Sequence, residues 1–139
     1  MLTVETTIKA QFHDLDPMGV VWHGNYPHFL ELARCDLLDR IGYNYEQMRD
    51  SGHAWPVVDM RIKYVRPIKL FEFVVVAETL VEFENRLKIA YVIRRQDGRE
   101  VLTRAHTIQV AVRIDSGEML LESPAILLDK VRGISCGGG

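Results

Sequence analysis

The sequence has few cysteines, no long apolar run and almost no excess of charge. Its 139 residues include two cysteines, Cys35 and Cys136, which are too few for a disulfide framework. No apolar stretch approaches the ~18 residues that a membrane-spanning helix needs. Glu5 and Lys9 interrupt the first segment, where a secretory signal would be apolar. We therefore expect a cytoplasmic protein without a membrane span.

The charge and length of the chain narrow its class further. The formal net charge is −2, whereas nucleic-acid-binding domains usually carry a strong basic excess, so we expect no nucleic-acid partner. A chain of this length can bury one real core but is too short for two domains of ordinary size. We expect a single domain over residues 1–133 and a disordered, glycine-rich tail over residues 134–139.

The hydrophobic pattern predicts strands on both sides of one long helix. Apolar and polar residues alternate over residues 2–12, which is typical of a half-buried strand. After a loop, apolar residues recur at spacings of three and four, so a mostly buried helix is expected to begin between His23 and Pro27 and to end at Gly42. Four more strands are expected at residues 55–65, 72–83, 86–95 and 99–114. A short helix or turn is expected at residues 43–52, and a terminal helix at residues 125–131.

This order of elements predicts an α+β fold in which a curved antiparallel sheet wraps around one long central helix. The strand expected at residues 72–83 is apolar on both of its faces. One face can pack on the helix, and the other then needs a cover. A second subunit is the expected source of that cover.

The loop before the helix carries the residues that are best suited to chemistry. Asp14 and Asp16 precede a helix start, where unpaired N–H groups and a partial positive charge can hold a carbonyl oxygen that becomes an oxyanion. A nearby carboxylate can attack such a carbonyl or activate a water. The alternative is structural, because either aspartate can simply cap the helix or a turn.

The amino-acid sequence of this loop resembles a family signature. The stretch Asp14-Leu-Asp16-Pro-Met-Gly19-Val-Val-Trp-His23-Gly-Asn-Tyr26 resembles that of hotdog-fold acyl-CoA thioesterases of the 4-hydroxybenzoyl-CoA thioesterase type, nearest the Tol–Pal-associated branch. The resemblance continues in Tyr26-x4-Glu31-x2-Arg34 and in Tyr64-x2-Pro67. It covers residues 8–112 and implies a hotdog fold, hydrolysis of acyl-CoA to a carboxylic acid and CoA, and no metal or other cofactor.

The resemblance also implies two catalytic residues. Asp16 matches the aspartate that acts as nucleophile on the thioester or as general base toward water. His23 matches a histidine whose backbone N–H lies where the family polarises the thioester carbonyl. Its side chain is expected to help position the thioester or the water.

Four further residues are expected to contact the substrate. Gly19 matches a glycine that lets the loop pass close to the acyl group, and Tyr26 matches an aromatic residue near the acyl pocket. Because the family's sites form between two subunits, Val57 and Val58 are expected to line that pocket. The expected assembly is a homodimer with facing helices, and two dimers are expected to form a tetramer.

Three positions depart from relatives of the family. The 4-hydroxybenzoyl branch has an aromatic residue where this chain has His23, so the resemblance gives less support to an aryl substrate. Some relatives have tyrosine where this chain has Phe12, so that phenol is absent. A sister group uses a carboxylate on the central helix, but Glu31 lies about two turns into the helix. We interpret Glu31 mainly as an ion-pair partner of Arg34 at i+3.

Several alternatives remain open from the sequence. The protein could be an acyl-carrier-protein thioesterase, a hotdog dehydratase or a non-catalytic acyl-CoA-binding protein. A CoA nucleotide needs basic side chains to bind its phosphates, and two sets of basic residues are candidates. For most of these residues, taken individually, we favour the interpretation that they lie on solvated strand faces. They are Arg61, Lys63 and Arg66, and Arg94, Arg95, Arg99 and Arg104.

Overall fold

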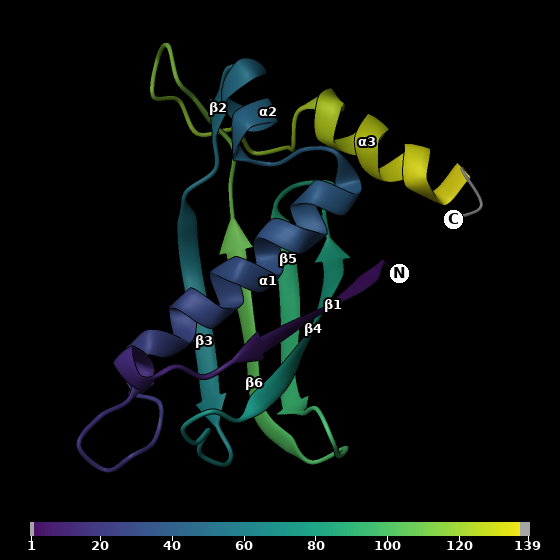
Figure 1. Cartoon of the computed structure of the whole chain (residues 1–139). Coiled ribbons are helices and arrows are strands. Elements are labelled where there is room, and N and C mark those ends of the chain that lie inside the picture. Colours follow the sequence, from purple (N-terminus) through teal and green to yellow (C-terminus); the bar gives the residue numbers. More distant parts are fainter. Residues whose placement is uncertain (1, 137–139) are drawn as a thin grey trace.

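Five antiparallel strands form the main sheet in a computed structural model that describes residues 2–136 (Figure 1). The strand order is β1-β4-β5-β6-β3, and the long helix α1 (Tyr26–Ile41) lies diagonally across one face. This arrangement confirms the predicted α+β class. The strand bounds are Thr3–Lys9 for β1, Val57–Tyr64 for β3, Phe73–Glu82 for β4, Leu87–Arg95 for β5 and Val101–Gln109 for β6.

Helix α1 begins and ends where the local sequence predicts. A 3-10 turn at His23–Asn25 leads into it, and Pro27 occupies the first turn, where its missing N–H would have no helical partner. Gly42 ends the helix in the left-handed conformation, with φ of 81°, and its N–H donates to the carbonyls of Leu38 and Asp39. One stripe of the helix is fully buried against the sheet, including Leu30, Ala33 and Leu37.

The expected strand at residues 99–114 is interrupted. Strand β6 ends at Gln109, because neither neighbouring strand extends past this residue. Gln109 pairs with Val57, the first residue of β3, and with Leu87, the first residue of β5. Beyond that point the chain has no strand beside it in the main sheet. It turns and forms β7 (Val112–Arg113), which pairs with β2 (His53–Ala54) in a separate two-stranded sheet.

The terminal helix α3 is longer than expected. It spans Ala125–Cys136, so residues 134–136 are helical rather than part of a tail, and positions 137–139 lie outside the described residues. Leu127 and Val131 are buried, and Ile134 continues this stripe by packing against the core. The short helix α2 (Tyr45–Asp50) lies within the predicted segment. No helix among residues 2–136 combines the length and apolar character of a bilayer-crossing segment.

An ion pair covers part of the sheet face that points away from α1. Glu5 of β1 lies beside Ala77, and Arg94 of β5 lies beside Val75, so their 3.1 Å contact crosses β4. Val75 is buried, whereas apolar side chains at the two ends of β4 stay exposed. The outer face of β4 is therefore partly covered within one chain.

Candidate active site

Asp14 has a structural role in the loop. Its Oδ2 accepts a hydrogen bond of 2.8 Å from the backbone N–H of Gln11. Its backbone carbonyl accepts bonds from the N–H of Trp22 and from Nδ2 of Asn25, both at 2.9 Å. These bonds fix the loop to the start of α1. For Asp14, the capping interpretation is the one that the contacts support.

Asp16 lies in a tight turn that leaves part of its carboxylate available. Its Oδ1 accepts a bond of 2.8 Å from the N–H of Met18, and its backbone bonds to Val20 and Gly19 close the turn. Gly19 adopts a φ of 80°, a left-handed conformation that disfavours other residues. Among residues 2–136, no hydrogen-bond donor or ion-pair partner reaches Asp16 Oδ2. The side chain is half-buried, so this oxygen can meet a ligand.

One pocket brings together three of the six predicted site residues. Asp16, His23 and Tyr26 line a cavity of about 290 Å³ at the beginning of α1. The remaining wall includes Tyr64 and the turn after it, through Pro67. Gly19 belongs to the turn that positions Asp16 but does not line the cavity. The Tyr64-x2-Pro67 motif is thus part of the same site as the Asp16 loop.

Tyr64 connects the end of β3 to the turn before α1. Its hydroxyl donates a 2.9 Å hydrogen bond to the backbone carbonyl of His23, and its ring meets that of Tyr26 edge-on at 4.7 Å. A peptide group is planar and trans, so holding the His23 carbonyl directs the following Gly24 N–H the opposite way. Within the described residues, the N–H groups of His23 and Gly24 have no acceptor. They are free to bind an oxygen.

Gly24 directly follows His23, which lines the pocket, and the sequence interpretation did not single it out. A Cβ at this position would overlap the indole ring of Trp22. The ring of Trp22 therefore lies directly over Gly24, and it also contacts the imidazole of His23, with centroids 5.2 Å apart. The only sequence signal was the glycine itself, between a histidine and a helix start.

Tyr26 is mainly a core residue. Only 2% of its surface is exposed, and burial raises the pKa of its phenol, although hydrogen bonds with the Ile68 backbone and with Thr103 oppose this shift. Tyr26 therefore presents one edge of a fixed, neutral ring to the pocket.

Val57 and Val58 are not part of this pocket in a single chain. They lie at the start of β3, roughly 23 Å from Tyr64 at the other end, from a rise of about 3.3 Å per residue. Both side chains are exposed. Strand β3 is an edge of the sheet, so its outer side has no strand beside it in the described chain. Their predicted role in acyl binding stays a prediction.

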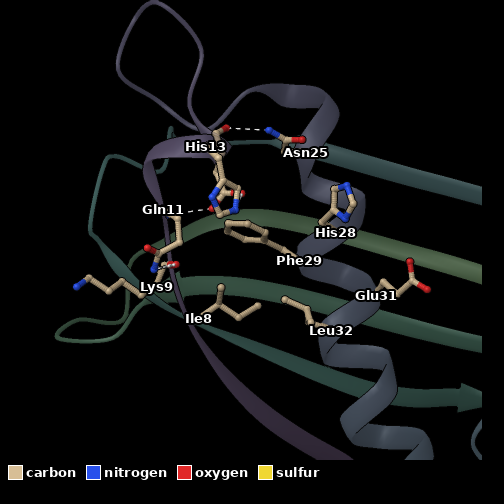
Figure 2. Close-up of a pocket in the computed structure, with 10 residues that line it drawn as sticks. Ile8, Lys9, Gln11, His13, Asn25, His28, Phe29, Glu31 and Leu32 are labelled. Atoms are coloured by element: carbon tan, nitrogen blue, oxygen red, sulfur yellow. Dashed lines mark hydrogen bonds and ion pairs between the residues drawn. The ribbon is translucent and has the colours of Figure 1, made fainter.

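A second, larger cavity lies between β1 and α1. It measures about 420 Å³, and Figure 2 shows Ile8 on β1 and, on the helix, the side chains of His28, Phe29, Glu31 and Leu32. Glu31 is 3.9 Å from Arg34, as the i+3 spacing predicts. This cavity contains neither Asp16 nor His23. Within residues 2–136, no cluster of three His, Cys, Asp or Glu side chains is suited to hold a metal ion.

Comparisons with known proteins agree on one family. The model of the "Thioesterase-like superfamily" matches residues 10–130. YneP of Bacillus subtilis, assigned as an acyl-CoA thioesterase, is 36% identical over 84 residues, which cover 60% of this chain and 60% of YneP. The matched segment thus spans less than two thirds of that relative. The acyl-CoA thioesterase YbgC of Haemophilus influenzae is 29% identical over 113 residues, or 81% of each chain.

The solved structures agree with the sequence relatives. The DHNA-CoA thioesterase of Staphylococcus aureus is similar, with a TM-score of 0.83 and 28% identity, over 100% of this chain and 97% of that one. A five-stranded antiparallel sheet with a long central helix is the common architecture. The chain belongs to the thioesterase-like superfamily and has the hotdog fold.

Proposed function

We propose that the protein is a thioester hydrolase that cleaves acyl-CoA to a carboxylic acid and CoA. One observation carries this proposal: Asp16 and His23 line the same cavity at the beginning of α1. The family and the names of its relatives, YneP and YbgC, support the reaction class.

In the proposed mechanism, Asp16 acts on the thioester carbon while backbone amides hold its oxygen. As a nucleophile, the carboxylate adds to the carbonyl, the CoA thiolate leaves, and water then cleaves the mixed anhydride. As a general base, Asp16 takes a proton from a water that adds to the same carbon. In both routes the negative charge develops on the carbonyl oxygen. The unpaired N–H groups of His23 and Gly24 stabilise it there, assisted by the partial positive charge at the start of α1.

The proposed assembly completes the acyl pocket. The edge strand β3 exposes apolar side chains along its length, among them Val57, Val58 and Met60. Antiparallel pairing of two copies along β3 would place the start of one strand beside the end of the other. Val57 and Val58 of a second copy would then approach Tyr64 and the Asp16 pocket. We propose this homodimer, and a tetramer of two such dimers, as the active form.

Two finer points stay predictions. The place in the Tol–Pal-associated branch rests on the resemblance, and the cytoplasmic location rests on the charged first segment and the lack of a long apolar run. The sequence predicts no preferred acyl group. The similar Staphylococcus aureus structure is named for an aryl-CoA substrate, whereas YbgC is named for acyl-CoA. Both classes therefore belong in a substrate test.

The test is release of free thiol from a panel of aliphatic and aryl CoA thioesters and from the matching acyl carrier protein thioesters. We expect turnover of at least one CoA thioester and slower turnover of the carrier-protein forms. A preference for the carrier-protein forms would assign the protein to that substrate class instead. CoA binding without any thiol release would contradict the proposed hydrolysis and favour a binding protein.

A further inference from the structure

Basic side chains face each other on the sheet surface that points away from α1. In the register of β3 and β6, Arg61 lies directly opposite His106, and Lys63 lies directly opposite Arg104. The residues that alternate with them, such as Ile62, pack against the core, so these four point outward. Like charges placed directly opposite destabilise a sheet. Sheet stability alone therefore does not account for this arrangement.

Three arginines near this surface are neutralised by glutamates. Arg94 contacts Glu5 at 3.1 Å, and Arg66 and Arg95 both contact Glu100 at 2.5 Å. For the outward residues of β3 and β6, the only acidic contact within the described chain joins Asp59 to His106, at 3.9 Å. Within residues 2–136, the charges of Arg61, Lys63 and Arg104 thus have no acidic partner.

These side chains surround a hollow rather than a flat patch. Arg61, Lys63, Arg104 and His106 line a cavity of about 230 Å³, and the first three are exposed to solvent. The side chains of Arg61, Lys63 and Arg104 are hydrogen-bond donors with positive charge. Guanidinium and ammonium groups in such a setting bind phosphate oxygens through charge-assisted hydrogen bonds. The chemistry of the hollow therefore fits an anion that carries phosphate.

The hollow lies close to the Asp16 pocket, on the other side of one strand. Lys63 immediately precedes Tyr64, which lines that pocket, and neighbouring side chains of a strand point to opposite faces. A ligand that joins the two sites passes the Val65–Pro67 turn, which begins roughly 7 Å beyond Lys63 along the strand. The pantetheine arm of CoA is long enough, because it extends over about the length of four residues of extended chain, on the order of 15 Å.

We propose that Arg61, Lys63 and Arg104 bind phosphate groups of the CoA moiety, while its thioester occupies the pocket of Asp16. The proposal rests on the proposed function and adds the residues that recognise the nucleotide end of the substrate. It separates these three residues from Arg66, Arg94 and Arg95, whose charges are already neutralised by glutamates.

The test is calorimetric titration of CoA into the full chain, with pantetheine as the phosphate-free probe. We compare the wild type with Arg61→Gln and Arg104→Gln. The matched control is Arg86→Gln, which removes the same charge from a residue that pairs with Glu82 at 2.9 Å. Each hollow variant is expected to bind CoA about tenfold more weakly and to lose part of the salt dependence, whereas the control is unchanged. Pantetheine binding should be equal in all four proteins.

A second readout keeps the test independent of folding defects. Arg104→Gln removes one member of the like-charge pair with Lys63, so its melting temperature should be at or above that of the wild type. Unchanged CoA affinity in both hollow variants, with acyl-CoA hydrolysis intact in the wild type, would overturn this inference alone. A wild type that neither binds CoA nor hydrolyses acyl-CoA would overturn the proposed function as well. The hollow variants could instead hydrolyse an acyl carrier protein thioester more slowly than the wild type while their CoA affinity is unchanged. That result would mean that the hollow binds an acidic protein, and it would overturn the inference too.

Discussion

Two carboxyl groups, of Asp16 in the loop before α1 and of Glu78 in β4, occupy contrasting environments. Asp16 lies half-buried in a loop, and one of its oxygens faces a cavity. Glu78, in the middle of β4, is fully buried under the helix. Its Oε1 lies 2.9 Å from the hydroxyl of Thr6, which is also 2.6 Å from Asp36 Oδ2. The first carboxylate is accessible to a substrate, whereas the second is enclosed in the core.

The contacts of Glu78 favour a carboxyl group that keeps its proton. A hydroxyl has a single hydrogen to donate, so Thr6 cannot donate to both carboxylates. Burial raises the pKa of Glu78 to about 8, and the nearby charges of Asp36 and Glu5 act in the same direction. At neutral pH, Glu78 is therefore mostly protonated and donates to Thr6, while Thr6 donates to Asp36. This carboxyl supports the fold and is unavailable for catalysis.

The largest expected effect is on activity, at the accessible carboxylate. Asp16→Asn should lower kcat by about 10²- to 10⁴-fold, because the amide can neither attack the thioester nor take a proton. The melting temperature should change little, since the substituted side chain still accepts the bond from the Met18 N–H. The measurement is steady-state thiol release, with Asp97→Asn in the β5–β6 turn as the control. More than a tenth of wild-type turnover in the folded variant would refute the role of Asp16.

The next effect is on stability, at the buried carboxyl. The folded-state pKa of Glu78 lies above its unfolded value, so the folded protein binds the extra proton. The free energy of unfolding should therefore fall as the pH rises from about 5 to 8, by up to about 1.4 kcal/mol per pH unit. Glu78→Gln should remove this slope and keep the activity. Urea unfolding at several pH values measures both.

Glu118→Gln in an exposed turn is the matched control for this experiment, because it should keep the slope of the wild type. Parallel pH profiles for the wild type and Glu78→Gln would mean that the folded protein does not retain a proton on Glu78.

A smaller effect is expected at the hydrogen bond between Tyr64 and His23. Tyr64→Phe keeps the ring contact with Tyr26 but frees the His23 carbonyl. Removing this exposed bond should cost about 1 kcal/mol of stability. The misaligned Gly24 N–H should lower kcat about tenfold with little change in KM. Tyr45→Phe removes a different tyrosine hydroxyl bond, the one from Arg34, and should leave kcat unchanged. Equal kcat values for Tyr64→Phe and the wild type would argue against this positioning role.

The sequence was sufficient for elements whose signal is local. Period-two alternation predicted β1, and apolar spacing with Gly42 predicted the extent of α1. The continuation of α3 from Val131 to Cys136 was not predicted, because Gly133 and the glycines after Cys136 are poor helix formers. The break of β6 at Gln109 depends on where β3 and β5 begin, which no local pattern contains.

For the candidate site, too, the sequence predicted only what depends on residues close together in the chain. Asp16, His23 and Tyr26 are close in sequence, and the loop motif was enough to group them. The bond from Tyr64 to His23 joins residues 41 positions apart, so the motif indicated Tyr64 but not its function. Glu78 stood in an apolar run as a single acidic residue, and its partners Thr6 and Asp36 come from two other elements. Val57 and Val58 depend on an assembly that a single chain does not contain.

The most direct measurement is a crystal structure of Asp16→Asn with an unhydrolysed acyl-CoA. We predict that the thioester carbon lies against the side chain of residue 16 and that its oxygen accepts hydrogen bonds from the N–H of His23 or Gly24. A thioester seated instead in the cavity between β1 and α1, near His28 and Glu31 (Figure 2), would contradict the account.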